Sequence, residues 1–117
     1  MVEVVGTEVF EDWFLALTEK EAEAVARVVG ILEGKGVALG FPYSSDIKGS
    51  PGLLELRVQS GGHALRVLYA FDPLRRAVLL LGGDKTGDER FYETLVPRAE
   101  RIWTEYLADL EKTERRK

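Results

Sequence analysis

The alternation of apolar and polar residues from Leu53 to Lys85 is the feature that most constrains the fold of this chain. It predicts three antiparallel strands joined by two tight turns, because residues two apart on a strand face the same side of a sheet. A Gly-Gly pair between two alternating runs favours a two-residue hairpin turn. With Gly61-Gly62 in that turn, Arg57 pairs with Arg66.

The two faces of this hairpin differ in character. One face is expected to be apolar and to cover helices, and it holds Leu54, Leu56, Val58, Leu65, Val67, Tyr69 and Phe71. The opposite face holds Glu55, Arg57, Gln59, Arg66 and Leu68. Like charges directly opposite one another on two strands are unfavourable. Two explanations stay open: Glu55 compensates the arginines diagonally, or the arginine pair binds an anion.

The run from Ala77 to Leu81 is continuously apolar, as expected for a central strand covered on both faces. With a four-residue loop after the turn at Asp72-Pro73, Leu79 and Leu81 would share the face of Arg66. The same alternation carries Lys85 to that face. The sequence therefore predicts that three cations converge there: Arg57, Arg66 and Lys85.

The flanking segments predict an α+β domain covering residues 1–117, with an antiparallel sheet of about four strands, two N-terminal helices and C-terminal helices. A short strand is expected in Val2 to Val5. Thr7 is an expected N-cap, and Thr18 with Glu21 forms a capping box that opens a second helix. The Gly-, Pro- and Ser-rich segment from Val37 to Gly52 predicts a loop.

The C-terminal part predicts two helical pieces, Asp88 to Leu95 and Pro97 to Leu110. Proline belongs in the first turn of a helix, so a break or kink is expected at Pro97.

Composition excludes several classes of protein. Without cysteine there is no disulfide framework and no thiolate nucleophile, and with His63 as the one histidine no metal site or cofactor is expected. No stretch approaches the roughly 20 apolar residues that span a bilayer, so a cytoplasmic protein without membrane partners is expected. The net charge of −4 is unevenly distributed. Residues 34–87 hold seven bases and four acids, whereas residues 1–33 hold two bases and eight acids.

Two strings of the chain, LLELRVQSGGHALRVLYAF and LLLGGDKTGDERFYE, resemble the RelE/ParE toxin superfamily. Within it they are similar to the HigB-like, phage Gp49-like toxins of bacterial type II toxin-antitoxin systems. The matching pattern is an E-L-R-V strand, a short turn, an R-V-L-Y strand, an apolar strand and a closing K-T. The resemblance extends from the first strand to about Leu110.

The resemblance implies a RelE-like fold and a ribosome-dependent mRNA endoribonuclease, or mRNA interferase, that inhibits translation. It also implies a cognate antitoxin with a helix-turn-helix DNA-binding domain. Arg57 matches the arginine of E-L-R-V, Arg66 that of R-V-L-Y and Lys85 the lysine of K-T, so these three look like the family's cationic cleft. Tyr69 matches a family tyrosine but falls on the core face, where a structural role is expected.

RNA cleavage by attack of a 2′-hydroxyl needs a base, cations for the developing phosphorane charge and an acid for the leaving oxygen. Guanidinium groups suit the charge stabilisation, because they stay protonated and bind phosphate in two places. A lysine acts as a base only if its pKa is depressed. The remaining acid or base candidates are Glu55, His63 and Asp84. Lys48 and Tyr92 are candidate contacts to RNA phosphate and base.

Two alternative functions stay open at this stage. The chain departs from basic RelE-like toxins in being acidic, and its single histidine is expected in the hairpin turn, whereas several HigB-type toxins place histidine and aspartate in their sites. A ParE-like inhibitor of DNA gyrase, which cleaves nothing, is one alternative. A non-catalytic protein-interaction domain of the same fold is the other.

Overall fold

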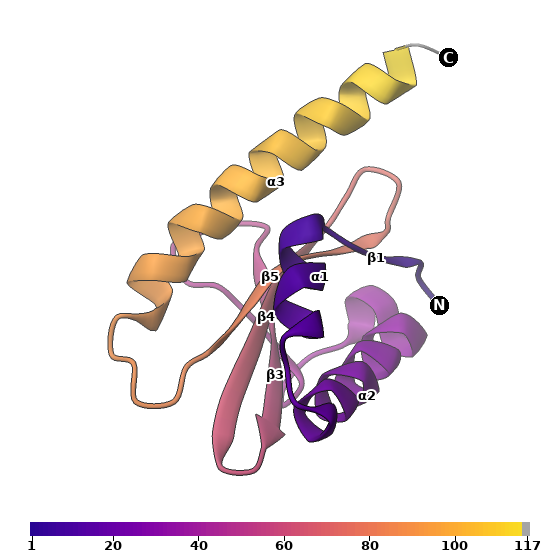
Figure 1. The fold of residues 1–117 in the computed structure, drawn as a ribbon. Helices are drawn as coiled ribbons and strands as arrows, with labels where there is room; N and C mark the ends of the chain where they lie inside the picture. Colours follow the sequence, from indigo (N-terminus) through magenta and orange to yellow (C-terminus); the bar gives the residue numbers. More distant parts are fainter. Residues whose placement is uncertain (116–117) are drawn as a thin grey trace.

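A five-stranded sheet lies at the centre of the computed structural model, which describes residues 1–115 (Figure 1). The strand order is β1-β5-β4-β3-β2. β1 runs parallel to β5, and all other neighbours are antiparallel. The elements in chain order are β1 (Val4–Gly6), α1 (Glu8–Leu15), α2 (Glu19–Lys35), the 3-10 turn η1 (Gly36–Ala38), β2 (Ser44–Asp46), β3 (Leu54–Ser60), β4 (His63–Phe71), β5 (Ala77–Asp84) and α3 (Phe91–Arg115).

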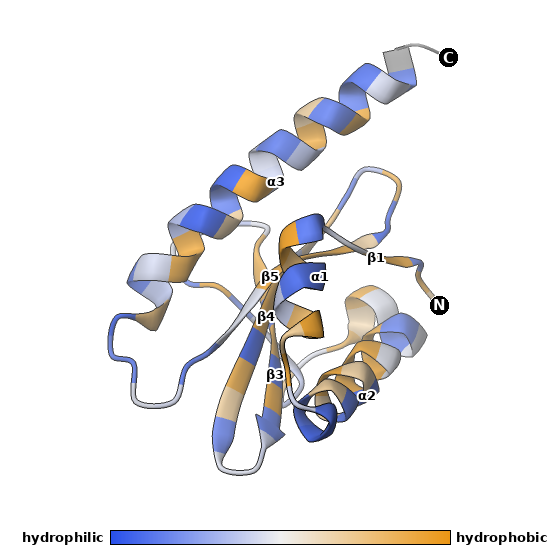
Figure 2. Cartoon of the chain, viewed as in Figure 1, coloured by the Kyte–Doolittle hydropathy of each residue, from blue (hydrophilic) through white to orange (hydrophobic). Residues whose placement is uncertain are grey.

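Helices cover both faces of this sheet. Helices α1 and α2 pack on one face, over a core that includes the predicted apolar residues of β3 and β4. Helix α3 packs on the other face through a second core that includes Leu68, Val78, Leu80 and Ala99. Figure 2 shows the alternation that creates these faces as successive apolar and polar bands along β3 and β4. The fold is α+β, as predicted, and no helix within residues 1–115 is both long and apolar enough to cross a membrane.

Both predicted N-terminal helix starts are confirmed. The Thr7 hydroxyl accepts a hydrogen bond from the Phe10 amide at 3.1 Å and donates one to the Leu80 carbonyl, so this cap also ties α1 to β5. Thr18 and Glu21 form the complete capping box of α2. These caps satisfy amides that have no partner inside the helix.

The predicted register of the β3-β4 hairpin is confirmed residue by residue. Ser60 pairs with His63 and Arg57 with Arg66. The two turn glycines, Gly61 and Gly62, have φ angles of 55° and 82°. A two-residue turn with positive φ at both positions matches the right-handed twist of the strands, and glycine adopts that conformation without steric cost.

The prediction that Leu79 shares the face of Arg66 is wrong. A β-bulge shifts the register between β4 and β5, so that Leu68 pairs with Leu81 but Tyr69 pairs with Leu79. Leu80 is the extra residue, and it packs under α3 while Leu79 joins the core under α1 and α2. A bulge places two residues of one strand against one of its partner, which simple alternation does not anticipate.

Two further expectations need correction. The predicted loop from Val37 to Gly52 contains the edge strand β2, so the sheet has five strands rather than about four. Tyr69 donates or accepts a 2.6 Å hydrogen bond with Ser44 of that strand, consistent with its expected structural role. The predicted division into two helical pieces at Pro97 is wrong, because the single helix α3 runs through this residue. Pro97 is exposed, and Ala99, two residues on, packs in the core under α3.

Candidate functional site

The face of the sheet under α3 carries a polar cluster centred on the carboxylate of Glu55. Glu55 is buried, and its two oxygens lie 3.6 Å from Arg57 Nη1 and 3.6 Å from Arg66 Nε. Ser45 of β2 donates a hydrogen bond to Glu55 Oε2 at 2.9 Å. Of the two explanations for the opposed arginines, compensation by Glu55 is the one seen in the fold.

The two arginines of this cluster differ in exposure. The Arg66 side chain is only 3% exposed, whereas that of Arg57 is 33% exposed. Arg66 donates from Nη1 to the Leu65 carbonyl, but its Nε has no hydrogen-bond partner among the described residues. Arg57 is therefore the arginine that solvent, or a phosphate, can reach directly.

Helix α3 closes this cluster from above through Tyr92. The Tyr92 hydroxyl donates to Glu55 Oε1 at 2.7 Å. Burial, together with the hydrogen bond to Glu55, raises the pKa of Tyr92, although the nearby Arg66 opposes that shift. Tyr92 therefore stays a neutral phenol. The ammonium of Lys85 lies 5.5 Å from the centre of the Tyr92 ring, which brings the third predicted cation to the same face.

A cavity of about 270 Å³ opens beside the cluster. Three predicted site residues line it: Glu55, Tyr92 and Lys48. Lys48 is exposed, so its ammonium stands in solvent near the cavity. The structure thus brings Lys48, Lys85 and the Glu55 cluster into one region.

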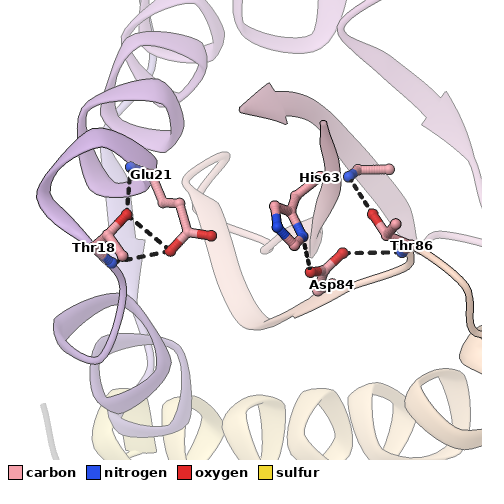
Figure 3. A network of polar contacts seen from close by, with 6 residues as sticks. Thr18, Glu21, His63, Asp84 and Thr86 are labelled. Carbon is pink, nitrogen blue, oxygen red and sulfur yellow. Dashed lines mark hydrogen bonds and ion pairs between the residues drawn. The ribbon is translucent and has the colours of Figure 1, made fainter. Parts of the chain in front are cut away.

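His63 and Asp84 form a second polar group at the end of the sheet (Figure 3). His63 Nδ1 lies 2.7 Å from Asp84 Oδ2, and both side chains are partly exposed. The Thr86 amide donates to Asp84 Oδ1 at 2.9 Å, and the Thr86 hydroxyl accepts from the Ala64 amide. Burial would raise the pKa of Asp84, but hydrogen bonds from Thr86 and His63 lower it below its ordinary value.

The position of His63 corrects the expectation of a turn histidine. His63 is the first residue of β4 rather than part of the turn, and strand pairing sets it diagonally across from Asp84. By alternation, this pair belongs to the face covered by α1 and α2, opposite to that of Arg66. The pair lies at the hairpin end of the sheet, whereas Glu55 lies near the start of β3, away from the turn.

Two glycines of β5 let helices approach this end of the sheet closely. A Cβ on Gly82 would lie 2.4 Å from the Trp13 ring of α1. A Cβ on Gly83 would lie 2.9 Å from Phe91 of α3. Gly83 is also the partner of Arg66 in the β4-β5 ladder, so this close approach of α3 lies beside the buried arginine.

Sequence reasoning missed two supporting residues, Ser45 and Thr86. Thr86 belongs to the closing K-T of the matched pattern, so a signal for it was present. Ser45 lies in a segment predicted to be a loop, and nothing local indicates its contact with Glu55. Across residues 1–115, no group of three or more His, Cys, Asp or Glu side chains is placed to hold a metal ion.

Comparison with known proteins decides the family. The family described as phage-derived Gp49-like proteins (DUF891) matches residues 12–104. The chain belongs to the Gp49-like family. It is 36% identical over 99 residues to HigB3, a candidate toxin of Mycobacterium tuberculosis, covering 84% of this chain and 87% of that protein. It is 35% identical over 105 residues to the candidate toxin HigB2 of the same organism, covering 86% of this chain and 52% of HigB2.

The fold of this Gp49-like chain has a counterpart among solved structures. A mutant of the Escherichia coli toxin RelE in the free state matches with a TM-score of 0.60, covering 82% of this chain and 96% of RelE. The sequence identity of 11% means that this match supports the fold alone. Together, the family, the relatives and the fold make the chain a RelE/HigB-like toxin of a toxin-antitoxin system.

Proposed function

We propose that this Gp49-like toxin is an endoribonuclease that cleaves mRNA on the ribosome and so inhibits translation. The observation that carries the proposal is the pair of reachable cations, Arg57 and Lys85, on one face of the sheet, with the exposed His63–Asp84 pair on the opposite face, where Asp84 directly precedes Lys85. Cations that can bind a phosphate and an imidazole that can take a proton meet two of the three needs of transesterification by a 2′-hydroxyl, and in this proposal the leaving 5′-oxygen takes its proton from water.

We assign phosphate binding to Arg57 and Lys85, with Lys48 as an outer contact. On their face of the sheet, Arg57 and Arg66 form one cross-strand row, and Lys85 follows in the next row beside Ala64. Arg66 has a structural role in the site, because its side chain is buried and its charge is paired with that of Glu55.

We assign proton transfer to His63, positioned by Asp84. The carboxylate accepts from Nδ1, so Nε2 stays available to take a proton from the attacking 2′-hydroxyl. Glu55 is a weaker candidate for the base, because Ser45, Tyr92 and the two arginines already occupy both of its oxygens. Lys85 serves as a clamp in this assignment.

Cleavage by this arrangement would need no metal ion, since the guanidinium and ammonium groups supply the positive charge at the phosphate. We further propose that a cognate antitoxin with a helix-turn-helix domain holds the toxin inactive and supplies the DNA binding of the pair. The relatives support an antitoxin partner, because HigB3 and HigB2 bear the names of candidate toxins.

The test is induction of the chain without antitoxin, followed by mapping of new 5′ ends on cellular transcripts. New ends on translated mRNA, retained in a purified translation system that contains a chelator selective for transition metals, would support the proposal. Arg57→Ala and Lys85→Ala should each remove most of the cleavage, whereas Arg98→Ala, at an exposed arginine of α3, should leave it intact. Growth arrest without new ends, but with loss of DNA supercoiling by gyrase, would overturn it in favour of gyrase inhibition.

A further inference from the structure

Two aromatic side chains next to the candidate site are left in solvent by the fold. Phe41 is 78% exposed and Tyr43 is 40% exposed, although both are large hydrophobic residues. They lie in the short segment between η1 and β2, which the sequence predicted to be a loop. The Arg57 guanidinium sits over the Phe41 ring, with 5.4 Å between its central carbon and the ring centre.

These residues border a cavity of about 280 Å³ at the edge of β3. Arg27 of α2 and Gln59 of β3 line it together with Phe41, Tyr43 and Arg57. Within residues 1–115, no acidic side chain lines this cavity. The cavity therefore combines two aromatic rings, an amide side chain and two guanidinium groups.

A second cavity of about 480 Å³ continues from the first toward the hairpin turn, and the two share Arg27 and Gln59. Lys20 lies on its wall, two helical turns before Arg27, and Glu23 adds an acid there. Together the cavities form a groove between α2 and the edge of β3 that has cations along its length. The groove reaches the candidate site through Arg57, which also contacts Glu55 at 3.6 Å.

We propose that Phe41, Tyr43, Arg27 and Arg57 form a subsite for one unpaired nucleobase of single-stranded RNA, next to the nucleotide that is cleaved. Unpaired bases stack on exposed aromatic rings and on guanidinium planes, and the flanking phosphates pair with Lys or Arg. Arg57 faces both the Phe41 ring and the candidate site, so it links base stacking to phosphate binding. This inference rests on the proposed function for the identity of its ligand.

The positive charge of the groove and its exposed ring beside a guanidinium suit RNA better than a protein partner. A peptide strand added to the edge of β3 would use backbone hydrogen bonds, and it would not need an exposed ring beside a guanidinium. A nucleotide can use both the ring and the guanidinium, because its base stacks on the ring and its phosphate pairs with the guanidinium. Binding of the antitoxin at this surface is therefore an outcome that the experiment must distinguish.

The experiment uses the full chain with Phe41→Ala, Phe41→Trp and a matched control, Leu74→Ala. Leu74 is 52% exposed in the β4-β5 loop and lines neither cavity of the groove. The probe is a fluorescent, unstructured 2′-O-methyl RNA, which cannot be cleaved because its 2′-oxygens are blocked. Fluorescence anisotropy gives its dissociation constant, and cleavage of mRNA on ribosomes gives kcat and KM separately.

Phe41→Ala is expected to weaken RNA binding and to raise KM by about tenfold, within the range measured for loss of one stacked base. Phe41→Trp should keep both the dissociation constant and KM near their wild-type values, and Leu74→Ala should change neither. An unchanged dissociation constant and KM in Phe41→Ala would overturn the inference, and so would a failure of Phe41→Trp to restore binding. The inference is equally wrong if Phe41→Ala weakens capture of the antitoxin while RNA binding stays unchanged.

The two proposals fail in different ways. If the wild-type chain cuts no transcript, the proposed endoribonuclease activity is wrong, yet the titration with uncleavable RNA still reports on the Phe41 subsite. If the wild-type and Leu74→Ala chains cut transcripts and Phe41→Ala does so with the same KM, the activity stands and the subsite is wrong.

Discussion

Each face of the sheet carries a polar group, and the two groups differ in how far their side chains are buried. Under α3, Glu55 is buried and its oxygens are engaged by Ser45, Tyr92 and two arginines. At the hairpin end, the side chains of His63 and Asp84 are 50% and 40% exposed. The first group is surrounded by protein, whereas the second faces solvent.

This contrast separates structural from chemical roles. A buried charge needs partners for the fold to be stable, so a change at Glu55 acts mainly on stability. An exposed imidazole contributes little to stability but can exchange protons with a substrate. The comparison therefore predicts that the two groups respond oppositely to substitution, in stability for one and in rate for the other.

The largest expected effect is on the rate of RNA cleavage in His63→Ala. Removing a general base typically lowers the rate by about 10²- to 10⁴-fold. Because His63 is half exposed, the free energy of unfolding should change by less than about 0.5 kcal/mol. Single-turnover cleavage on ribosomes and urea unfolding measure the two quantities.

The matched control for His63→Ala is Arg90→Ala, at an exposed residue of the loop before α3. This variant should match the wild type in both rate and stability. If His63→Ala cleaves RNA at the wild-type rate, the His63–Asp84 pair has no chemical role. Glu55 then becomes the candidate base.

The largest expected effect on stability is in Glu55→Gln. Glutamine keeps the shape but removes the negative charge, which leaves the guanidinium of Arg66, only 3% exposed, without compensation. Breaking a buried ion pair by removing one partner costs about 3 to 5 kcal/mol. Chemical denaturation should show this as a lower midpoint with an unchanged slope.

A second substitution distinguishes loss of charge from loss of packing. Adding Arg66→Met to Glu55→Gln removes the uncompensated cation, so part of the stability should return. Glu93→Gln, at an exposed glutamate of α3, is the matched control and should leave the midpoint unchanged. Equal midpoints in Glu55→Gln and Glu93→Gln would show that charge compensation does not hold this region together.

The contrast between the faces was only partly predictable from sequence. Alternation and the Gly-Gly turn were enough to place Arg57 opposite Arg66 and to set the apolar face, because both follow from local geometry. The bulge at Leu80 and the course of α3 through Pro97 depend on packing between distant segments. Burial of Arg66 and Glu55 under α3 was missed for the same reason.

The pairing of His63 with Asp84 shows the same limit for the candidate site. Both residues were candidates by type, but their contact depends on the β4-β5 register, which the bulge shifts. The exposure of Phe41 is equally non-local, since a loop phenylalanine in sequence does not reveal whether a core covers it. Residue types therefore indicated the candidate site residues, and the tertiary structure determined which of them are in contact.

A smaller effect on stability is expected in Tyr92→Phe. The variant keeps the ring against Phe91 but loses the hydroxyl that donates to Glu55 at 2.7 Å. A hydrogen bond to a charged group contributes about 1.5 kcal/mol or slightly more. Tyr43→Phe, which alters a more exposed tyrosine, is the control for chemical denaturation. Equal midpoints in the two variants would mean that α3 does not depend on this bond to stay docked.

The smallest expected effect is the pH dependence that Asp84 contributes to stability. Burial alone would raise its pKa, but hydrogen bonds from Thr86 and His63 hold it below the ordinary value of 3.8. A carboxyl whose pKa is lower in the folded state stabilises the fold above its unfolded pKa, and the contribution is lost as the pH falls through the folded value. Asp84→Asn should therefore be slightly less stable than the wild type at pH 6, and the difference should shrink as the pH falls below 3.8 and vanish once the pH lies below the lowered pKa of Asp84.

Urea unfolding at a series of pH values measures this difference, with Asp12→Asn as a control at an exposed aspartate of α1. Because Asp84 is 40% exposed, solvent screens its contacts, and the loss at pH 6 should be smaller than that of Tyr92→Phe. A loss as large as that of Glu55→Gln, or one that persists in acid, would contradict the contrast. Either result would mean that the His63–Asp84 pair holds the end of the sheet together, as the Glu55 cluster does under α3.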